Sequence, residues 1–546
     1  MLAHGAGASQ TATARASLRR VHPRHVVGSG HPRRARGVRL AVLCMMAWAA
    51  SASATPYDLI PVRHPIDEEL RLLETSGERP LEPMPLFTRP WQSLQVQLAL
   101  TGGLDSTAGS LSLYRLSREL QRDRPEPGPG PRSTPRVAQL FDEPSAQRLE
   151  ASIGVEGVGI ATDDTSFYAT GSGLHGRFAL SAGGWEAYSH LEAAHVKDAQ
   201  TFADPLVKGE DFILFTEESY VQYTSVPHAW LWTIGAGRER FAWGPGTEGS
   251  LLLSAQAPPL TGLWAGIGIP RWRVYLSTVS ATVSTSAGEQ MAAHRLEWEA
   301  RPGLRLGIDE GVRYHGASMQ LPYVIGVVPY TLVQRIQAQD EPDSEATLRN
   351  NVMVGADVSW RVVPGTRLYG ELLIDDLHAR SAENPTKMGF QLGWEGVGHW
   401  GGSRLAWGGE WTRISQYVYT SFFGQAWKSQ DQPLGFATGP DVSRVLVWGL
   451  WDVRRDWQLR LSAAQTDKGE GDVDTPYVPG SPRVDAWPLS GQVETTRAVE
   501  GALRWWPASG VDIALSGGGR WISDADHVAG RSRQEPFGTI ALRLTR

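Results

Sequence analysis

The chain has 546 residues, a formal net charge of −6, 60 glycines, 22 tryptophans and a single cysteine. Beyond the N-terminal segment it has no apolar run long enough to cross a bilayer as a helix, which argues against a helical membrane protein. An acidic chain without a basic stripe argues against nucleic acid as a partner. The glycine, tryptophan and tyrosine content instead favours short strands joined by turns.

Residues 1–54 have the composition of an export signal peptide. Arginines from Arg33 to Arg39 precede the apolar run 40–50, and Ala52-Ser53-Ala54 offers a small-residue cleavage site. Removing this segment removes eight arginines and no acidic residue, so the net charge changes from −6 to −14. It also removes Cys44, the only cysteine. The exported chain then needs no disulfide and has no thiol nucleophile or thiolate ligand.

Residues 55–91 predict a short helix followed by a Pro-rich segment. Ile66, Leu70 and Leu73 have the spacing of one apolar helix face. Gly77 suits a helix end, and the prolines of 80–90 prevent the helix from continuing. We interpret this segment as a periplasmic lead-in that lies outside the wall of the strand-rich region, residues 92–546.

The stretch 350–376 predicts a β-hairpin whose pattern recurs along the chain. Apolar and polar side chains alternate through residues 351–361, as in a strand with one apolar and one polar face. Pro364-Gly365 supplies the turn, and 368–375 returns as the second strand. Other strands repeat this pattern, with charges such as Glu410 and Arg460 on the polar face.

Further strand signals follow one another at short intervals. Weaker candidates at 94–100 and 110–114 precede them. The total of about 16 to 18 strands is typical of an outer-membrane barrel. Besides the hairpin, the candidates are 149–160, 166–170, 176–192, 220–226, 229–238, 272–283, 294–300, 304–312, 388–395, 404–414, 444–452, 457–464, 496–506, 511–521 and 537–546.

Alternation alone is compatible with two architectures. A water-soluble sandwich buries the apolar face, whereas a membrane barrel turns it toward lipid. The export signal, the cysteine-free mature chain, and Trp and Tyr near strand ends favour the barrel, because such rings suit the headgroup zone. The predicted fold class is therefore all-β, a transmembrane antiparallel β-barrel of about 18 strands with a short N-terminal helical segment.

Several segments resemble the Wzi-type capsule assembly proteins of Gram-negative outer membranes. The clearest is GRERFAWGPG at 237–246, followed by LLLS at 251–254 and by LEWEARP at 296–302. LYGELLIDD at 368–376 and the loop from PLG at 433–435 to GPD at 439–441 are also similar. The resemblance implies a barrel of about 18 strands, with periplasmic helices, that binds capsular or exopolysaccharide at the cell surface. The Pro-rich insert near Pro125 and the terminal Arg546 depart from the family pattern.

The predicted function is that of an outer-membrane capsule assembly protein that binds or anchors surface polysaccharide. The alternatives are a porin-like channel and an exopolysaccharide export barrel, because about 18 strands enclose a lumen wide enough to conduct unless it is plugged. Outer-membrane lipid and polysaccharide export machinery are further expected partners. We expect no enzyme, cofactor or metal site, since no HExxH or G-x-S-x-G motif is present. A hydrolase with a Ser–His pair on adjacent strands remains the weakest alternative.

Three short motifs have a structural interpretation beside a functional one. Trp243-Gly244-Pro245-Gly246 suggests a sugar-stacking loop or, in preference, a turn with Trp243 as an interfacial anchor. Asp375-Asp376 is a poor calcium site or acid–base pair and is interpreted as a solvated strand end with a loop-fixing aspartate. The glycine-rich stretch 171–176 lacks the Lys-Ser/Thr of a phosphate loop and predicts a hairpin turn.

Long connections at 314–349, 417–443 and 467–494 are predicted on the extracellular side. Their aromatic rings, including Phe422, Phe423 and Trp487, are expected to stack on sugars. Their cations are expected to pair with uronate or phosphate groups of a polymer that the acidic chain otherwise repels. The alternative is that these loops only fold over the barrel mouth. The ligand-binding candidates are Trp243, Tyr323, Arg335, Trp427, Lys428, Tyr477 and Arg483.

Overall fold

A computed structural model describes most residues from Leu59 to Leu100 and the chain from Arg148 to Thr545. Gaps remain at 162–166, 183, 197–210, 226–229, 285–287, 341–349, 377–384, 479–485 and 509–510. The predicted signal peptide, the Pro-rich insert and the strand candidate at 110–114 lie outside the described residues. Of the helices that are described, none is both long and apolar enough to cross a membrane.

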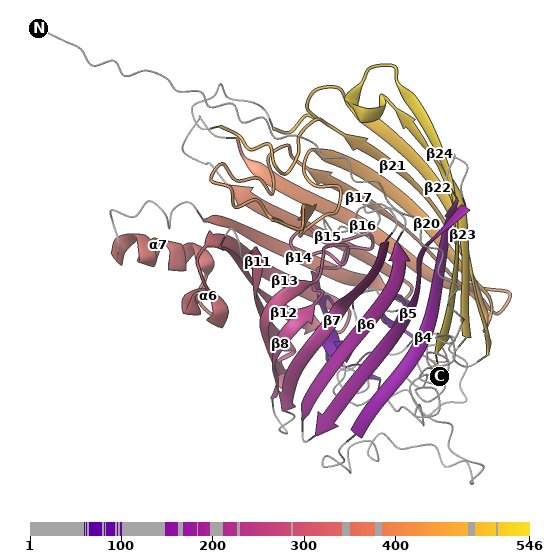
Figure 1. Cartoon of the computed structure of the whole chain (residues 1–546), viewed down its shortest axis with the longest axis horizontal. Helices are drawn as coiled ribbons and strands as arrows, with labels where there is room; N and C mark the ends of the chain where they lie inside the picture. The colour runs from indigo at the N-terminus through magenta and orange to yellow at the C-terminus, as the bar shows by residue number, and fades with distance from the viewer. Residues whose placement is uncertain are drawn as a thin grey trace, which may run out of the picture. The chain divides into compact units, whose positions relative to one another are not determined.

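Within the described residues, 18 antiparallel strands close into one barrel. The wall follows chain order and closes where β24 (Ser532–Thr545) pairs with β4 (Arg148–Ala161) (Figure 1). Closure leaves no unpaired sheet edge in lipid. The predicted all-β barrel is confirmed. The other wall strands are β5 (Phe167–Ala182), β6 (Trp185–Val196), β7 (Asp211–Ser225), β8 (Leu231–Glu239), β10 (Leu260–Ile269), β11 (Val274–Ser284), β12 (Glu289–Arg301), β13 (Leu304–His315), β14 (Asn351–Val363), β15 (Thr366–Asp376), β16 (Lys387–Trp400), β17 (Ser403–Ile414), β20 (Val442–Arg454), β21 (Trp457–Lys468), β22 (Glu494–Ala508) and β23 (Val511–Ser523).

The remaining elements are short and lie outside the barrel sheet. The helices are α2 (Pro65–Ser76), α6 (Leu321–Ile325) and α7 (Tyr330–Asp340), with 3₁₀ turns η2 (Pro270–Trp272) and η4 (Ala525–His527). Three two-stranded pairs combine β1 (Leu59–Ile60) with β3 (Trp91–Gln92), β2 (Thr88–Arg89) with β9 (Ala242–Trp243), and β18 (Lys428–Ser429) with β19 (Gln432–Pro433). The pair of β2 and β9 joins the N-terminal lead-in to the loop between β8 and β10 of the barrel.

The wall strands turn apolar side chains outward and polar side chains inward. In β14, Val354, Val358 and Trp360 are 39–40% exposed, whereas Asp357 and Ser359 on the opposite face are buried. A soluble sandwich has the reverse arrangement, with the apolar face covered and the charged face wet. The outward apolar face therefore decides between the two architectures in favour of the barrel.

The two ends of the barrel differ in the length of their connections. At one end, turns such as Pro302-Gly303 and Pro364-Gly365 join consecutive strands directly. Gly365 has a φ of +83°, which glycine adopts without the steric cost of a side chain. The opposite end carries the connections 316–350, 415–441 and 469–493. Because outer-membrane barrels have short periplasmic turns and long extracellular loops, this difference orients the barrel.

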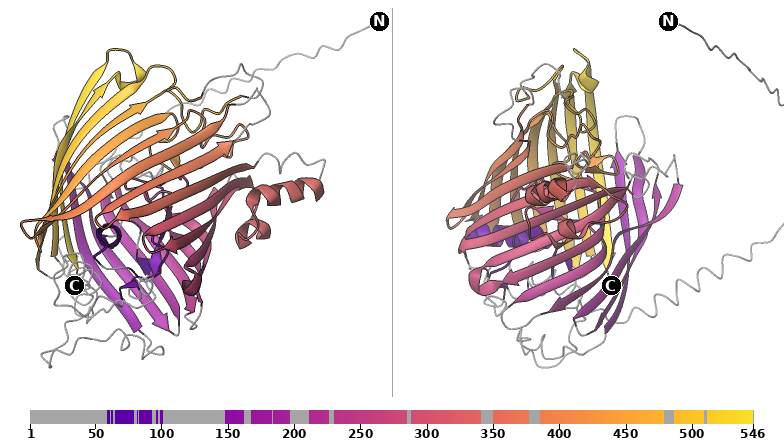
Figure 2. Two further views of the ribbon diagram at one scale, coloured as in Figure 1. Left: turned by 180° about the vertical axis from the view of Figure 1, so that it is seen from behind. Right: turned by 90° about the vertical axis from the view of Figure 1, so that its left-hand side faces the viewer.

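Helix α2 lies inside the barrel at the periplasmic end, against β15 and β16 (Figure 2). It begins at Pro65, where proline is well tolerated, and ends before Gly77, which has a φ of +66°. The carbonyl of Thr75 accepts a hydrogen bond of 2.9 Å from the N–H of Gly365 in the β14–β15 turn. The predicted helix is therefore present. It was expected outside the barrel wall, whereas the structure places it within the ring of strands.

Strand β10 has no counterpart in the sequence analysis. Its inward positions include Gly262, Gly266 and Gly268, so no polar side chains alternate there with the outward Leu263 and Ile267. Without that alternation, the period-two signal disappears. The strand is nevertheless paired along its whole length with β8 and β11.

Three further interpretations of the sequence are wrong. The single strand predicted at 176–192 is divided, because β5 ends at Ala182 and β6 begins at Trp185. The stretch 171–176, predicted as a hairpin turn, lies inside β5. The β4–β5 pairing contains a β-bulge opposite this stretch, because its register shifts between Glu156 and Val158 of β4. Glycine is common in a strand interior at a bulge, so these glycines are compatible with a strand. The strand candidate at 94–100 is also wrong, because its described residues Val96 and Ala99 are helical.

Candidate functional site

The lumenal face of β12 to β17 carries charged side chains that are paired rather than open to water. Arg295 is fully buried, and its Nη1 lies 2.8 Å from Asp309 Oδ2. Its Nη2 donates to Asp357 Oδ1 at 3.1 Å, and its Nε donates to the hydroxyl of Thr88 at 2.9 Å. A cation held by two carboxylates is already neutralised, so Arg295 does not offer a free charge to an ion in transit.

The connection between β8 and β10, residues 240–259, turns into the lumen. Its backbone is held by carboxylates of the wall. Glu371 accepts hydrogen bonds from the N–H groups of Gly246 (3.1 Å) and Leu251 (2.8 Å), and Glu410 accepts one from Thr247 (2.7 Å). Hydrogen bonds to charged acceptors are among the stronger ones in proteins, so these bonds fix the loop inside the barrel.

The N-terminal lead-in reaches the same place from the periplasmic end. Strand β2 of the lead-in pairs with β9 of the inward loop, and the N–H of Gly244 donates to Phe87 O at 2.8 Å. The lead-in is itself bound to the wall, because Glu297 accepts a hydrogen bond of 2.7 Å from Thr88 Oγ1 and Arg305 donates one of 2.6 Å to Met84 O. We call residues 83–92 together with 240–259 the plug.

Helix α2 is attached to the wall by ion pairs. Arg404 of β17 donates two hydrogen bonds to Glu69, of 2.6 and 2.9 Å, and also binds Asp452 of β20. Glu68 binds Arg460 of β21. Burial raises the pKa of Glu68, but the guanidinium groups of Arg460 and Arg71 lower it by more, so this pKa lies below its ordinary value. The helix therefore bridges strands β17, β20 and β21.

The long extracellular connections 415–441 and 469–493 fold over the mouth, and we call them the cap. The indole N–H of Trp427 donates to Leu252 O at 2.8 Å, and the hydroxyl of Tyr419 donates to Leu251 O at 2.6 Å. Both rings are fully buried in one cluster with Trp243 of the plug. Asp375 accepts the N–H of Tyr419 at 2.7 Å, which is the loop-fixing role predicted for this strand end, but the side chain is buried and not solvated as predicted. The cap and the plug are thus in direct contact.

The two connections of the cap are also joined to each other. Asp441 accepts the N–H of Gly471 at 2.9 Å, and the rings of Tyr417 and Tyr477 meet edge to face at 5.6 Å. Lys428 Nζ lies 2.7 Å from Asp474. Partial burial lowers the pKa of Lys428, but its hydrogen bonds to Asp474 and to a second aspartate raise it above its ordinary value. The cap therefore presents one continuous surface.

The sequence matches the family described as capsule assembly protein Wzi over residues 142–534. The chain belongs to this family. No curated protein matches it in a comparison of sequences. Together with the outward apolar face, membership of the Wzi family identifies the chain as an outer-membrane β-barrel.

Solved structures resemble the fold of this Wzi-family barrel. One is Wzi of Escherichia coli, an outer membrane protein involved in group 1 capsule assembly and described as a carbohydrate-binding β-barrel. It has 15% identity and a TM-score of 0.61, with 89% of this chain and 98% of that chain covered. OccD3 of Pseudomonas aeruginosa has 8% identity and a TM-score of 0.43, covering 74% and 94%. The channel DcaP of Acinetobacter baumannii has 10% identity and a TM-score of 0.35, covering 73% and 98%.

The structure places the predicted ligand-binding residues of the Wzi-family barrel in different surroundings. Trp243, Tyr323, Trp427 and Tyr477 are buried, so none of these rings presents an open face. Trp243 lies in the lumen and not at the membrane interface, because it pairs with the lead-in. Lys428 and Arg335 reach the surface, on the cap and on α7 respectively, and Arg483 lies outside the described residues. The exposed aromatic residues of the cap are Phe422, Phe423 and Trp487.

The plug anchors Glu371, Glu410 and Glu297 are functional residues that the sequence analysis did not assign to a site. All three occupy the polar face of predicted strands. The sequence showed only that these residues are acidic and point into the barrel. Acidic residues at such positions are expected both in a water-filled channel and in a barrel whose wall binds a plug, so the sequence does not distinguish the two. Only the inward direction of loop 240–259 separates the two possibilities.

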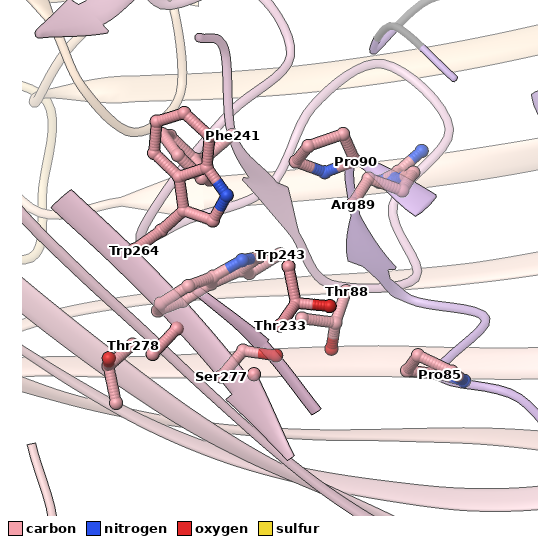
Figure 3. Close-up of a pocket in the computed structure, with 12 residues that line it drawn as sticks. Pro85, Thr88, Arg89, Pro90, Thr233, Phe241, Trp243, Trp264, Ser277 and Thr278 are labelled. Carbon is pink, nitrogen blue, oxygen red and sulfur yellow. The ribbon is translucent and has the colours of Figure 1, made fainter. Parts of the chain in front are cut away.

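A cavity of about 70 Å³ lies between the plug and the wall strands β8, β10 and β11 (Figure 3). Its lining includes the rings of Trp243, Trp264 and Phe241, with Thr88 and Arg89 of the lead-in. The indole N–H of Trp264 has no hydrogen-bond partner among the described residues. This volume accommodates a few water molecules, one of which can satisfy that N–H, and it is too small for a polymer segment. In the part of the chain that is described, no cluster of His, Asp or Glu could hold a metal ion.

Proposed function

We propose that this barrel binds capsular or exopolysaccharide at the cell surface and does not conduct solutes through its lumen. The observation that carries the proposal is the plug, which is hydrogen-bonded to the wall and in contact with the cap. A conducting barrel of this size needs a lumen free of such obstruction. Membership of the Wzi family supports the same conclusion, since its E. coli member is described as a carbohydrate-binding barrel.

The polymer contact that we propose is the outer surface of the cap. Phe422 and Phe423 are about half exposed and meet edge to face at 5.3 Å. Such rings offer apolar faces to sugar C–H groups. Lys428, whose partners Asp431 and Asp474 are exposed and so bind it only weakly, and Arg483 on the neighbouring connection supply cations for uronate or phosphate groups. Cations are needed locally because the acidic chain repels an acidic polymer elsewhere. No catalytic step or cofactor is part of this proposal.

The outward face of the barrel is proposed to contact outer-membrane lipid. The periplasmic end, where α2 is attached, is where we propose that polysaccharide export machinery would meet the barrel. These two contacts concern different surfaces from the cap, so variants of the cap leave them intact.

A deletion strain provides the test of this function. We expect cells that lack the protein to shed surface polysaccharide into the medium, measured as the ratio of cell-bound to free polymer. Restoration by the wild-type gene is the control. Polymer trapped in the periplasm would instead support the export alternative, and an unchanged ratio would contradict both.

Substitutions in the cap test the proposed contact. Replacing Phe422, Phe423 and Lys428 together by Ala is expected to lower polymer retention without lowering barrel yield. Trp272→Ala is the matched control, because Trp272 is an aromatic residue, 64% exposed, in a turn at the opposite, periplasmic end. Trp427→Ala is expected to behave differently, destabilising the fold by about 3–5 kcal/mol through the cavity it leaves. Retention that stays at the wild-type level in the triple variant would remove the cap from the proposal.

A further inference from the structure

Helices α6 and α7 of the β13–β14 connection lie on the outside of the barrel, next to β11, β12 and β13 (Figure 1). The outward side chains Ala292, Val312 and Tyr314 are buried beneath them, whereas Ile308 on the same outward face of β13 is 59% exposed. Gly326, between the helices, approaches the wall so closely that a Cβ atom would lie 2.6 Å from Thr278 Cγ2. The helical hairpin 321–340 is therefore packed onto a surface that would otherwise face lipid.

The hairpin covers polar groups that point outward from the wall. Glu310 accepts hydrogen bonds from the backbone N–H groups of Tyr330 (2.6 Å) and Thr331 (3.0 Å) in the first turn of α7. His294 Nε2 lies 3.3 Å from the same carboxylate. The N-terminus of α7 thus supplies two donors and a favourable dipole to a charge on the outer wall. An uncovered charge on the lipid-facing side of a barrel is destabilising, whereas a charge in water needs no such cover. Shielding of Glu310 by the hairpin is therefore useful only if this part of the wall lies within the membrane.

The outer face of the hairpin is apolar. Six apolar side chains are 40–67% exposed, and Arg335 is the only charged residue in 321–337. This surface continues the lipid-facing wall, because Val354 lies directly opposite Glu310 and is exposed on the outside. The six side chains are Leu321, Ile325, Val327, Val328, Leu332 and Ile336.

We propose that the hairpin α6–α7 is embedded in the outer leaflet, where its apolar face contacts lipid and its inner face shields the His294–Glu310 pair. The inner face of the hairpin already packs Tyr323, Tyr330 and Val333 against the wall, so the exposed apolar side chains form a second face that only lipid covers. Lipid is the occupant because the hairpin continues a lipid-facing surface and carries almost no charge. Arg335 is long enough to extend its guanidinium toward headgroup phosphates.

Site-specific fluorescence quenching in bilayers tests this placement. The only cysteine is Cys44, so a Cys44→Ser background accepts single cysteines without ambiguity. Leu332→Cys and Ile325→Cys are each labelled with a small fluorophore in the full-length protein, reconstituted into vesicles whose acyl chains carry bromine. Ile308→Cys is the wall control expected to be quenched, and Phe422→Cys is the cap control expected not to be quenched. Heat-modifiable migration in SDS confirms that each variant is folded.

We expect both hairpin labels to lose fluorescence to the same extent as the Ile308 label, with little quenching by aqueous iodide. Quenching by iodide alone would overturn the proposal and place the hairpin in water. Protection from both quenchers, together with cross-links between copies at Leu332→Cys, would also overturn it in favour of contact with a second copy. Polymer retention is a separate readout, so the failure of this inference leaves the proposed function intact.

Discussion

Arg295 illustrates how the barrel carries charge in its interior. The side chain is fully buried between Asp309 and Asp357, and it also donates to the hydroxyl of Thr88 in the plug. Such a group stabilises the fold only while all partners are present, because removing one partner leaves an uncompensated charge. The residue therefore couples the integrity of the wall to that of the plug.

Replacing this arginine by leucine leaves two carboxylates facing each other without a cation. We expect Arg295→Leu to lower the free energy of unfolding by about 3–5 kcal/mol, measured from urea unfolding of the reconstituted barrel by tryptophan fluorescence. Arg520→Leu is the control, because Arg520 is 55% exposed and lies 4.0 Å from Glu535. Its loss should change stability by less than about 1 kcal/mol. Equal effects of the two substitutions would contradict the assignment of Arg295 as a structural centre.

The burial of Trp427 and Tyr477 could not be predicted from the sequence. Both residues lie in polar loops, a setting in which aromatic rings usually serve recognition. Their burial depends on partners far away in the chain, since Trp427 donates to Leu252, 175 residues earlier. Phe422 and Phe423, from the same loop, have the same local character but remain exposed. Local composition identified the loop, and long-range packing decided which of its rings face water.

Glu371 makes two of the hydrogen bonds that hold the inward loop 240–259 to the wall. We expect Glu371→Ala to release the loop, because the N–H groups of Gly246 and Leu251 lose their acceptor, at a cost of about 1–3 kcal/mol each. In planar-bilayer recordings, the wild-type barrel should show no large steady conductance, and the variant should show intermittent openings.

Glu535→Ala is the control for this recording. It removes an inward carboxylate of β24 that contacts Arg533 and does not touch the plug. If the Glu371→Ala barrel has wild-type stability and shows no conductance, other contacts are sufficient to hold the loop in the lumen. Steady conductance of the wild-type barrel would count against the proposed function itself.

Helix α2 responds to pH through Glu68. Because its pKa is lowered in the folded state, this carboxylate contributes stability that is present above its unfolded-state pKa and lost as pH falls through its folded-state pKa. We therefore expect α2 to be fully attached at neutral pH and to loosen below about pH 4. Hydrogen exchange of residues 65–76, corrected for intrinsic rates, measures this change. Glu68→Gln should exchange faster at neutral pH and depend less on acidity, whereas an unaltered pH profile would refute the role of Glu68.

At the scale of the whole molecule, the alternation of apolar and charged residues predicted the strands of the wall, and the export signal and the aromatic residues near strand ends favoured a barrel over a sandwich. Strands such as β14 and β15 repeat the alternation without interruption, and the outward exposure of Val354 and Trp360 confirms its meaning. Strand β10 was not predicted, because glycines occupy several of its inward positions and remove the alternation. The plug was not predicted for another reason. The sequence of a loop does not indicate whether the loop points into the barrel or away from it, and Glu371 lies 120 residues from Leu251, whose backbone N–H it binds.

The contact between cap and plug has a mechanical consequence for a protein that retains a polymer. Under the proposed attachment, drag on a long chain outside the cell would pull on the cap, which is bonded through Trp427 to Leu252 of the plug. The plug pairs with the lead-in through β2 and β9, and α2 of the lead-in is bonded to Arg404 near the periplasmic turns. Tension applied at the outer surface is thus distributed through the cap, the plug and helix α2 to wall strands at both ends of the barrel.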